Sequence, residues 1–162
     1  MGIDPGMGTT GWGIIRSVKG NLKYLDSGRI STSPAQPSGE RLAKLYNELQ
    51  GVARLHNVVL CGVESGFVGR SAQSSLKLGQ ARAAAVLAAQ TLMIPVRDVS
   101  PREVKLAVTG HGGASKEQVG YMVGKLLNLE FEPNESDISD ALAIAICVAL
   151  ERQPVVVRRA GR

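Results

Sequence analysis

Four carboxylates lie at the ends of apolar or glycine-rich runs, where an acid is costly to bury unless something compensates its charge. Asp4 lies in GIDPG, directly after the first apolar residues, and Glu64 ends the run VVLCGVE. Asp137 and Asp140 open the run DISDALAIAICVAL. Acids that folding brings together from the ends of buried elements form a hard-oxygen site suited to Mg²⁺ or Mn²⁺. The pattern therefore predicts a divalent-metal site built from three separate segments.

Each acid also has a purely structural interpretation. Asp4 could cap a glycine-rich turn, and Glu64 could be an exposed strand end. Asp137 and Asp140 are spaced i, i+3, so both would project from one face of a first helical turn, where they could cap the helix and complement its dipole. Two like charges at that spacing are unfavourable unless a cation lies between them. It is the joint occurrence of the acids, in this order along the chain, that favours the metal site.

The segment GIDPGMGTTGWG surrounds the first acid and is rich in glycine. Pro5 and Gly6 predict a turn directly after Asp4. Because glycine lets the backbone approach a ligand closely, Gly6, Gly8, Gly11 and Gly13 are expected to admit a phosphate group. A glycine-rich hairpin turn is the alternative interpretation.

The charge balance favours an anionic partner. Lys and Arg number 19 against 14 Asp and Glu, giving a net charge of +5, and nucleic acid is the usual partner of such a protein. Arg70, Lys77, Lys105 and Lys116 fall in or near predicted loops and helix starts, where they could bind phosphates beside a cleavage point. Solvated surface charge is the alternative for any one of them. Phe67 lies in a predicted loop and could stack on a base or anchor the loop.

The elements that must position these residues follow from hydrophobic periodicity and from turn signals. Strands are expected at residues 1–5, 11–18, 21–30, 58–64 and 94–100, and helices at 40–56, 74–92, 101–110, 115–127 and 137–151. A meander of three strands followed by strand–helix alternation predicts an α/β fold with a mixed five-stranded sheet flanked by helices. We expect a single domain over residues 1–152 and a basic C-terminal tail over residues 153–162.

Other features limit the possible classes of protein. No run is long enough to span a bilayer, and the start of the chain shows no signal peptide, so we expect a cytoplasmic protein without a membrane partner. Cys61 and Cys147 lie inside apolar runs and are expected to be buried and reduced. The small residues of the predicted helix 74–92 suit either a dimer surface or packing against the sheet.

Several stretches together resemble the bacterial RuvC Holliday-junction resolvases along nearly the whole chain. The matching stretches are GIDPG with TGWGII, VESGF, SSLKLGQARAAA, SPREVKLAVTGHGGASKEQV and DISDALAIAI. This resemblance implies an RNase H-like fold, a homodimer and a structure-selective DNA endonuclease. It also implies a role in recombination and repair alongside the RuvA–RuvB branch-migration complex.

The resemblance further implies roles for individual residues. Asp4, Glu64, Asp137 and Asp140 would bind metal, with Lys116 contributing to catalysis. The position of Asp137 varies between Asp and His among relatives, so its role stays open. Two ions about 4 Å apart, Mg²⁺ or Mn²⁺, would support hydrolysis of the scissile phosphodiester in both symmetric strands of a four-way junction. The resemblance places Phe67 at a junction-stacking aromatic, and Lys105 and Lys116 at basic positions associated with DNA binding. Together with Arg70 and Lys77 from the charge pattern, these are the predicted DNA-binding residues.

Three rival interpretations remain open at this point. An actin-like ATP-binding domain shares a similar opening Asp–Gly turn, but such proteins normally use two domains to enclose ATP. A nuclease of the YqgF type would act on RNA. A non-catalytic junction-binding protein would not need the intact set of acids.

Overall fold

The fold was analysed in a computed structural model, which describes residues 1–65, 71–132 and 134–151. Three of the sequence predictions lie outside these residues. They concern Phe67, Arg70 and the basic tail 153–162.

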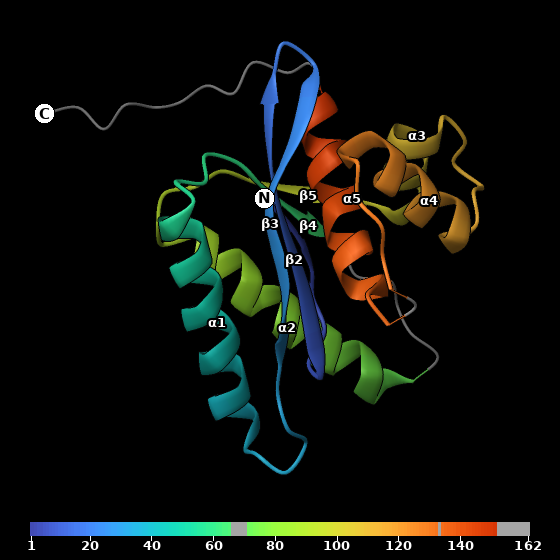
Figure 1. The fold of residues 1–162 in the computed structure, drawn as a ribbon. Helices are drawn as coiled ribbons and strands as arrows, with labels where there is room; N and C mark the ends of the chain where they lie inside the picture. Colours follow the sequence, from blue (N-terminus) through green and yellow to red (C-terminus); the bar gives the residue numbers. More distant parts are fainter. Residues whose placement is uncertain (66–70, 133, 152–162) are drawn as a thin grey trace, which may run out of the picture.

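One mixed sheet forms the centre of the molecule (Figure 1), with strands in the order β3-β2-β1-β4-β5. β1, β2 and β3 pair in an antiparallel manner, and β1, β4 and β5 pair in parallel. The strands are β1 (Gly2–Asp4), β2 (Thr9–Val18), β3 (Asn21–Ser31), β4 (Cys61–Glu64) and β5 (Val96–Val99). The predicted mixed five-stranded sheet is confirmed. β4 begins three residues later than predicted, because Asn57 adopts a positive φ and Val58 still donates a hydrogen bond to the end of the preceding helix.

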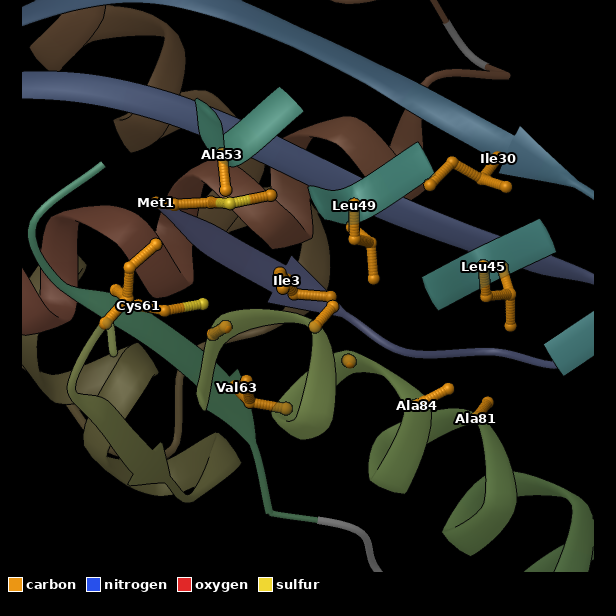
Figure 2. Packing of buried hydrophobic residues seen from close by; sticks show 14 of the residues in the cluster. Met1, Ile3, Ile30, Leu45, Leu49, Ala53, Cys61, Val63, Ala81 and Ala84 are labelled. Atoms are coloured by element: carbon orange, nitrogen blue, oxygen red, sulfur yellow. The ribbon is translucent and has the colours of Figure 1, made fainter. Parts of the chain in front are cut away.

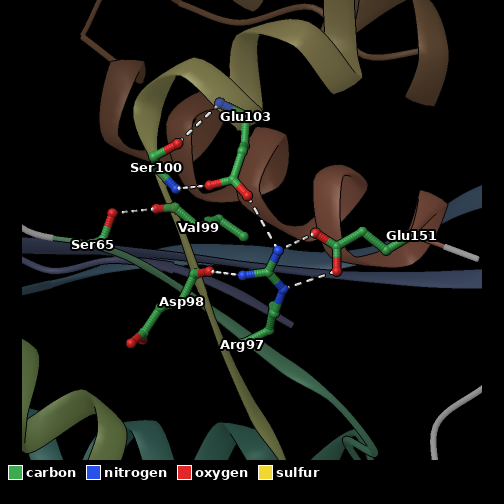
Figure 3. A network of polar contacts seen from close by, with 7 residues as sticks. All are labelled: Ser65, Arg97, Asp98, Val99, Ser100, Glu103 and Glu151. Atoms are coloured by element: carbon green, nitrogen blue, oxygen red, sulfur yellow. Dashed lines mark hydrogen bonds and ion pairs between the residues drawn. The ribbon is translucent and has the colours of Figure 1, made fainter. Parts of the chain in front are cut away.

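Five helices flank this sheet. They are α1 (Ser38–Leu55), α2 (Ala72–Gln90), α3 (Pro101–Thr109), α4 (Lys116–Leu127) and α5 (Ser136–Leu150). Capping boxes begin α3 at Ser100 with Glu103 (Figure 3) and α4 at Ser115 with Gln118. Such boxes satisfy backbone donors that a helix start leaves unpaired. Within the described residues, no helix is long and apolar enough to cross a membrane.

α1 and α2 cover one face of the sheet and enclose the larger hydrophobic cluster (Figures 1 and 2). Ile3, Cys61 and Val63 project from β1 and β4 into this cluster. The small residues of α2 lie in the same core, at Ala81, Ala84, Ala85, Ala88 and Ala89. The Ala-rich face of this helix therefore packs against the sheet, which was the second of the two interpretations of its small residues.

α5 lies against the opposite face, with α3 and α4 outside it (Figure 1). The helix approaches the sheet so closely that glycine is needed at the contact. A Cβ atom on Gly13 would come within 2.6 Å of Leu142, and one on Gly62 within 2.7 Å of Val148. Gly2 and Gly11 face the backbone of α5 in the same way. The space beside Gly11 and Gly13, which the sequence assigned to a phosphate, is thus filled by a helix.

Candidate active site and metal centre

Strand register and alternation bring the first two acids together. β1 and β4 are parallel neighbours, with Gly2 opposite Gly62 and Ile3 opposite Val63. Successive side chains of a strand point to opposite faces, and both glycines face α5. Asp4 and Glu64, two residues beyond these glycines, therefore lie on the α5 side of the sheet, at the carboxyl ends of adjacent strands.

The start of α5 brings the other two acids to the same edge. The backbone of Asp137 packs against Gly11, and Gly11 pairs with Asp4 in the sheet. Asp137 lies in the first helical turn, and Glu135 occupies the N-cap position without a side-chain capping bond. Asp137 therefore does not serve as the cap of this helix, which was one of its structural interpretations.

A pocket of about 310 Å³ opens where these segments meet. Asp4, Glu64 and Asp140 line it together with Lys105 and Lys116. Its remaining wall is largely apolar and is formed by Pro101, Val104, Val119, Ala143 and Ile144. Three of the four predicted acids and two of the predicted cations thus share one pocket, whereas Asp137 stands beside it.

The carboxylates of this pocket carry charge that is only partly compensated. Burial, followed by the nearby charges of Glu64, Asp140 and Asp137, raises the pKa of Asp4 to about 7. Burial and the charge of Asp140 also raise the pKa of Glu64. Lys116 opposes both shifts. A site that holds several acids in this way favours a bound cation.

Lys116 supplies the positive charge nearest to the acids. Its Nζ lies 2.7 Å from Oδ2 of Asp140, and this hydrogen bond raises the pKa of the lysine. Within residues 1–65, 71–132 and 134–151, no three Asp, Glu, His or Cys side chains are already arranged as metal ligands. If Oδ2 of Asp140 bound a metal, this oxygen would have to share or exchange its bond with the ammonium group.

The chemistry of the donors fits a hard divalent cation. Asp4, Glu64 and Asp140 offer only carboxylate oxygens, the ligands that Mg²⁺ and Mn²⁺ prefer. Among the residues that the structure describes, neither a thiol nor an imidazole lines the pocket. Asp137 is close enough to influence the charge of Asp4 and could serve as a further ligand.

The structure separates the predicted DNA-binding residues into groups. Lys105 and Lys116 line the acid pocket. Lys77 is exposed on α2 and does not line it. Phe67 and Arg70 lie outside the described residues, so their predicted roles stay predictions.

Sequence reasoning missed two arginines that contact the backbone near the acids. Arg82 donates a hydrogen bond to the carbonyl of Glu64, and Arg41 donates one to the carbonyl of Met7, in the loop after Asp4. Arg82 had a signal, because it interrupts a run of small residues in a helix. Nothing in the sequence pointed to Arg41, because a single charged residue is common in an amphipathic helix.

Comparisons with known proteins match one family over most of the chain. Residues 1–148 match the family described as crossover junction endodeoxyribonuclease RuvC. A protein of that name from Chloroflexus aurantiacus is 43% identical, covering 92% of this chain and 91% of its own length. Another, from Aeromonas hydrophila, is 42% identical, covering 100% of this chain and 92% of its own.

Solved structures with a similar fold include two Holliday-junction proteins. T. thermophilus RuvC in complex with a Holliday junction substrate superposes with a TM-score of 0.84 at 36% identity, over 90% of this chain and 89% of that one. The yeast mitochondrial Holliday junction resolvase Ydc2 superposes with a TM-score of 0.65 at 13% identity, over 91% of this chain and 77% of that one, a likeness of fold alone.

Proposed function

Since the chain belongs to the crossover junction endodeoxyribonuclease RuvC family, we propose that it resolves four-way DNA junctions by metal-dependent cleavage. The predicted family and the predicted RNase H-like α/β fold are confirmed. The observation that carries the proposal is the pocket at the carboxyl ends of β1 and β4, where Asp4, Glu64 and Asp140 meet Lys105 and Lys116. Acids that can hold a metal and cations that can bind a phosphate are the groups that metal-dependent hydrolysis of a phosphodiester uses.

The acids act by holding metal. Asp4, Glu64 and Asp140 would be the principal ligands, with Asp137 as the fourth acid. Two divalent ions, Mg²⁺ or Mn²⁺, supply an activated water and stabilise the leaving oxygen when they are bound. The apolar wall behind the acids keeps their environment poor in water, which strengthens every charge interaction inside the pocket.

The two lysines act on the phosphate. Lys116 reaches into the acid pocket from the first turn of α4, and Lys105 reaches it from α3. An ammonium group in this place stabilises the negative charge that develops on the phosphate during cleavage. Phe67, Arg70 and Lys77 are proposed to contact the DNA further from the scissile bond.

A homodimer suits a four-way junction, since two related active sites can cut two symmetric strands. The outward side of α2 offers a surface for it. Leu76 and Leu87 are 63% and 55% exposed there, and Gly79 and Ala83 lie exposed between them. Small residues between two leucines allow a second α2 to approach closely, so we assign the dimer contact to this side of the helix.

The proposed nuclease domain is followed by a basic tail. Residues 1–152 form the nuclease domain, and residues 153–162 add a basic tail with Arg158, Arg159 and Arg162 that increases attraction to DNA. The protein acts in the cytoplasm, in recombination and repair, on junctions supplied by the RuvA–RuvB branch-migration complex.

A comparison of three nucleic-acid substrates tests the proposal against its rivals. The protein is incubated with Mg²⁺ and a labelled synthetic four-way junction, a linear duplex of the same sequence, or a structured RNA. We expect cleavage of the junction only, and no thermal stabilisation by ATP. Cleavage of the RNA but not of the junction, stabilisation by ATP, or tight junction binding without cleavage would each favour a rival function.

A further inference from the structure

Arg82 links α2 to the strand end that carries Glu64. Its Nε donates a hydrogen bond to the carbonyl oxygen of Glu64, at 3.2 Å. The guanidinium also pairs with Asp98 of β5, with Nη2 2.5 Å from Oδ1. One side chain thus joins the end of β4 to the neighbouring strand β5.

A second contact holds the residue that follows Glu64. The backbone N–H and the hydroxyl of Ser65 both donate to the carbonyl oxygen of Val99, at 2.8 and 3.0 Å (Figure 3). Asp98 precedes Val99, and its carboxylate points away from Arg97 in the same view. Arg82 and Ser65, which hold the backbone around Glu64, therefore both bond to residues at the end of β5.

An equivalent contact holds the loop after Asp4. Arg41 of α1 is buried, with Nη2 2.8 Å from the carbonyl oxygen of Met7 and Nε 2.9 Å from Oγ1 of Thr32. The Thr32 hydroxyl itself donates to the same carbonyl at 2.5 Å. No acid pairs with Arg41 among the residues that the structure describes. Its charge is therefore compensated by the backbone of this loop.

We propose that Arg82 and Arg41 are positioning residues that set the spacing between Asp4 and Glu64 for metal binding. Both reach from the helix layer on the far face of the sheet. Arg82 bonds the backbone carbonyl of Glu64 itself, and Arg41 bonds that of Met7, three residues after Asp4. The inference rests on the proposed metal-dependent function. Groups that orient metal ligands commonly change metal affinity by roughly 10- to 100-fold when they are removed.

The role of Arg82 is tested with Arg82→Gln, Asp98→Asn and the double variant. Mn²⁺ binding to the free protein is measured by electron paramagnetic resonance, and junction cleavage is measured across Mn²⁺ concentrations. We expect Arg82→Gln to weaken Mn²⁺ binding by roughly 10-fold and to raise the Mn²⁺ needed for half-maximal cleavage, with an unchanged KM for the junction. Because the two residues act as one unit, the double variant should lose little more than Arg82→Gln alone. Arg82→Lys should restore part of the affinity.

Arg97→Gln is the matched control. Arg97 is adjacent to Asp98 in β5. Its guanidinium pairs with Glu103 and Glu151 and donates to the backbone carbonyl of Asp98 (Figure 3), but among the described residues its side chain makes no hydrogen bond or ion pair with the end of β4. This variant should lose some thermal stability and keep wild-type Mn²⁺ binding. Equal Mn²⁺ affinities of Arg82→Gln and Arg97→Gln would overturn the role of Arg82.

The role of Arg41 is tested through its partner, because removing a buried arginine endangers folding. Thr32→Val keeps the shape of the side chain and removes both hydroxyl bonds. We expect weaker Mn²⁺ binding than in the wild type. Because Arg41 keeps its own bond to Met7 in this variant, Arg41→Lys is measured beside it, and wild-type Mn²⁺ binding in both variants would overturn the role of Arg41. These outcomes are separable from the proposed function: a wild type that binds Mn²⁺ without cutting junctions would refute the function, while the Mn²⁺ comparison would still decide the positioning roles.

Discussion

The backbone carbonyl of Asp137 occupies the space into which any side chain at position 11 would project, so Gly11 is required for α5 to meet the sheet at this point. Gly11 pairs with Asp4 across β1 and β2. The contact therefore sets how closely the start of α5, with Asp137 and Asp140, approaches the acid on β1. The approach of the acids on α5 to Asp4 therefore depends on the absence of a side chain at residue 11.

Gly11→Ala should damage both stability and catalysis. The added methyl group must push the start of α5 away from β2, at a cost on the order of 2 kcal/mol in the free energy of unfolding. The acids of α5 would move with it, so junction cleavage should fall more than the loss of folded protein explains. Urea unfolding and cleavage rates at a temperature where the variant is folded measure the two effects.

Gly8→Ala is the control within the same glycine-rich segment. A Cβ atom at Gly8 would meet no other atom within 4 Å. Stability and cleavage should both stay near wild-type values. A loss as large as that of Gly11→Ala would show that the segment, rather than the contact with Asp137, is what matters.

The sequence predicted the elements and the acids better than it predicted their contacts. Periodicity gave all five strands and five helices, because each element buries a regular set of apolar residues. Asp4 and Glu64 were predicted to lie together from their positions after apolar runs, and both line one pocket in the structure. The role of Gly11 and Gly13 was misassigned, because glycine permits close approach of a helix as readily as of a phosphate. Only the packing of α5 distinguishes the two.

Asp4 should destabilise the metal-free protein at high pH. Its pKa is raised by burial and by the other acids from 3.8 to about 7, so the folded state favours the protonated carboxyl. The contribution of Asp4 to the free energy of unfolding is therefore complete below pH 4 and is lost as the pH rises through 7. In EDTA, Asp4→Asn should be more stable than the wild type at pH 8, by on the order of 2 kcal/mol, and no more stable at pH 4. Urea titrations at both pH values measure this, and a variant less stable than the wild type at pH 8 would contradict it.

Lys116→Gln should separate metal binding from catalysis. The change removes the ammonium group that is bonded to Asp140, so Mn²⁺ binding at pH 8.5 should be no weaker than in the wild type. Cleavage should nevertheless fall by roughly 100-fold, because the phosphate loses a positive charge in the transition state. Lys125→Gln, on the same helix and stacked on Tyr121, should change neither measurement. Loss of Mn²⁺ binding in Lys116→Gln would indicate that the lysine builds the site rather than acting on the phosphate.

The exposed side of α2 should control the oligomeric state. Leu76→Glu with Leu87→Glu places charges on the proposed dimer contact without entering the core, since both leucines are exposed. Sedimentation should show a dimer for the wild type and a folded monomer for the double variant. A matched change at Leu55, which is 75% exposed at the end of α1, should leave the dimer intact. A double variant that remains dimeric would place the contact elsewhere.

The arginines show the limit of prediction from the sequence in this protein. Arg82 and Arg41 lie 18 and 34 residues away from the carbonyls that they contact. Neither spacing has a local signature, because the contacts arise only when α1 and α2 pack beneath the sheet. The acids were predictable because Asp4 and Glu64 end strands and Asp137 and Asp140 begin a helix, whereas the arginines that support them depend on tertiary packing.

The central claim is tested most directly by measuring binding and Mg²⁺-dependent cleavage of one synthetic four-way junction by the wild type and by Asp4→Asn. The wild type should cut two symmetric strands. The variant should bind the junction with an affinity within about 3-fold of the wild type, yet cleave at least roughly 1,000-fold more slowly. A variant that cuts at the wild-type rate, or a wild type that leaves the junction intact, would contradict the account.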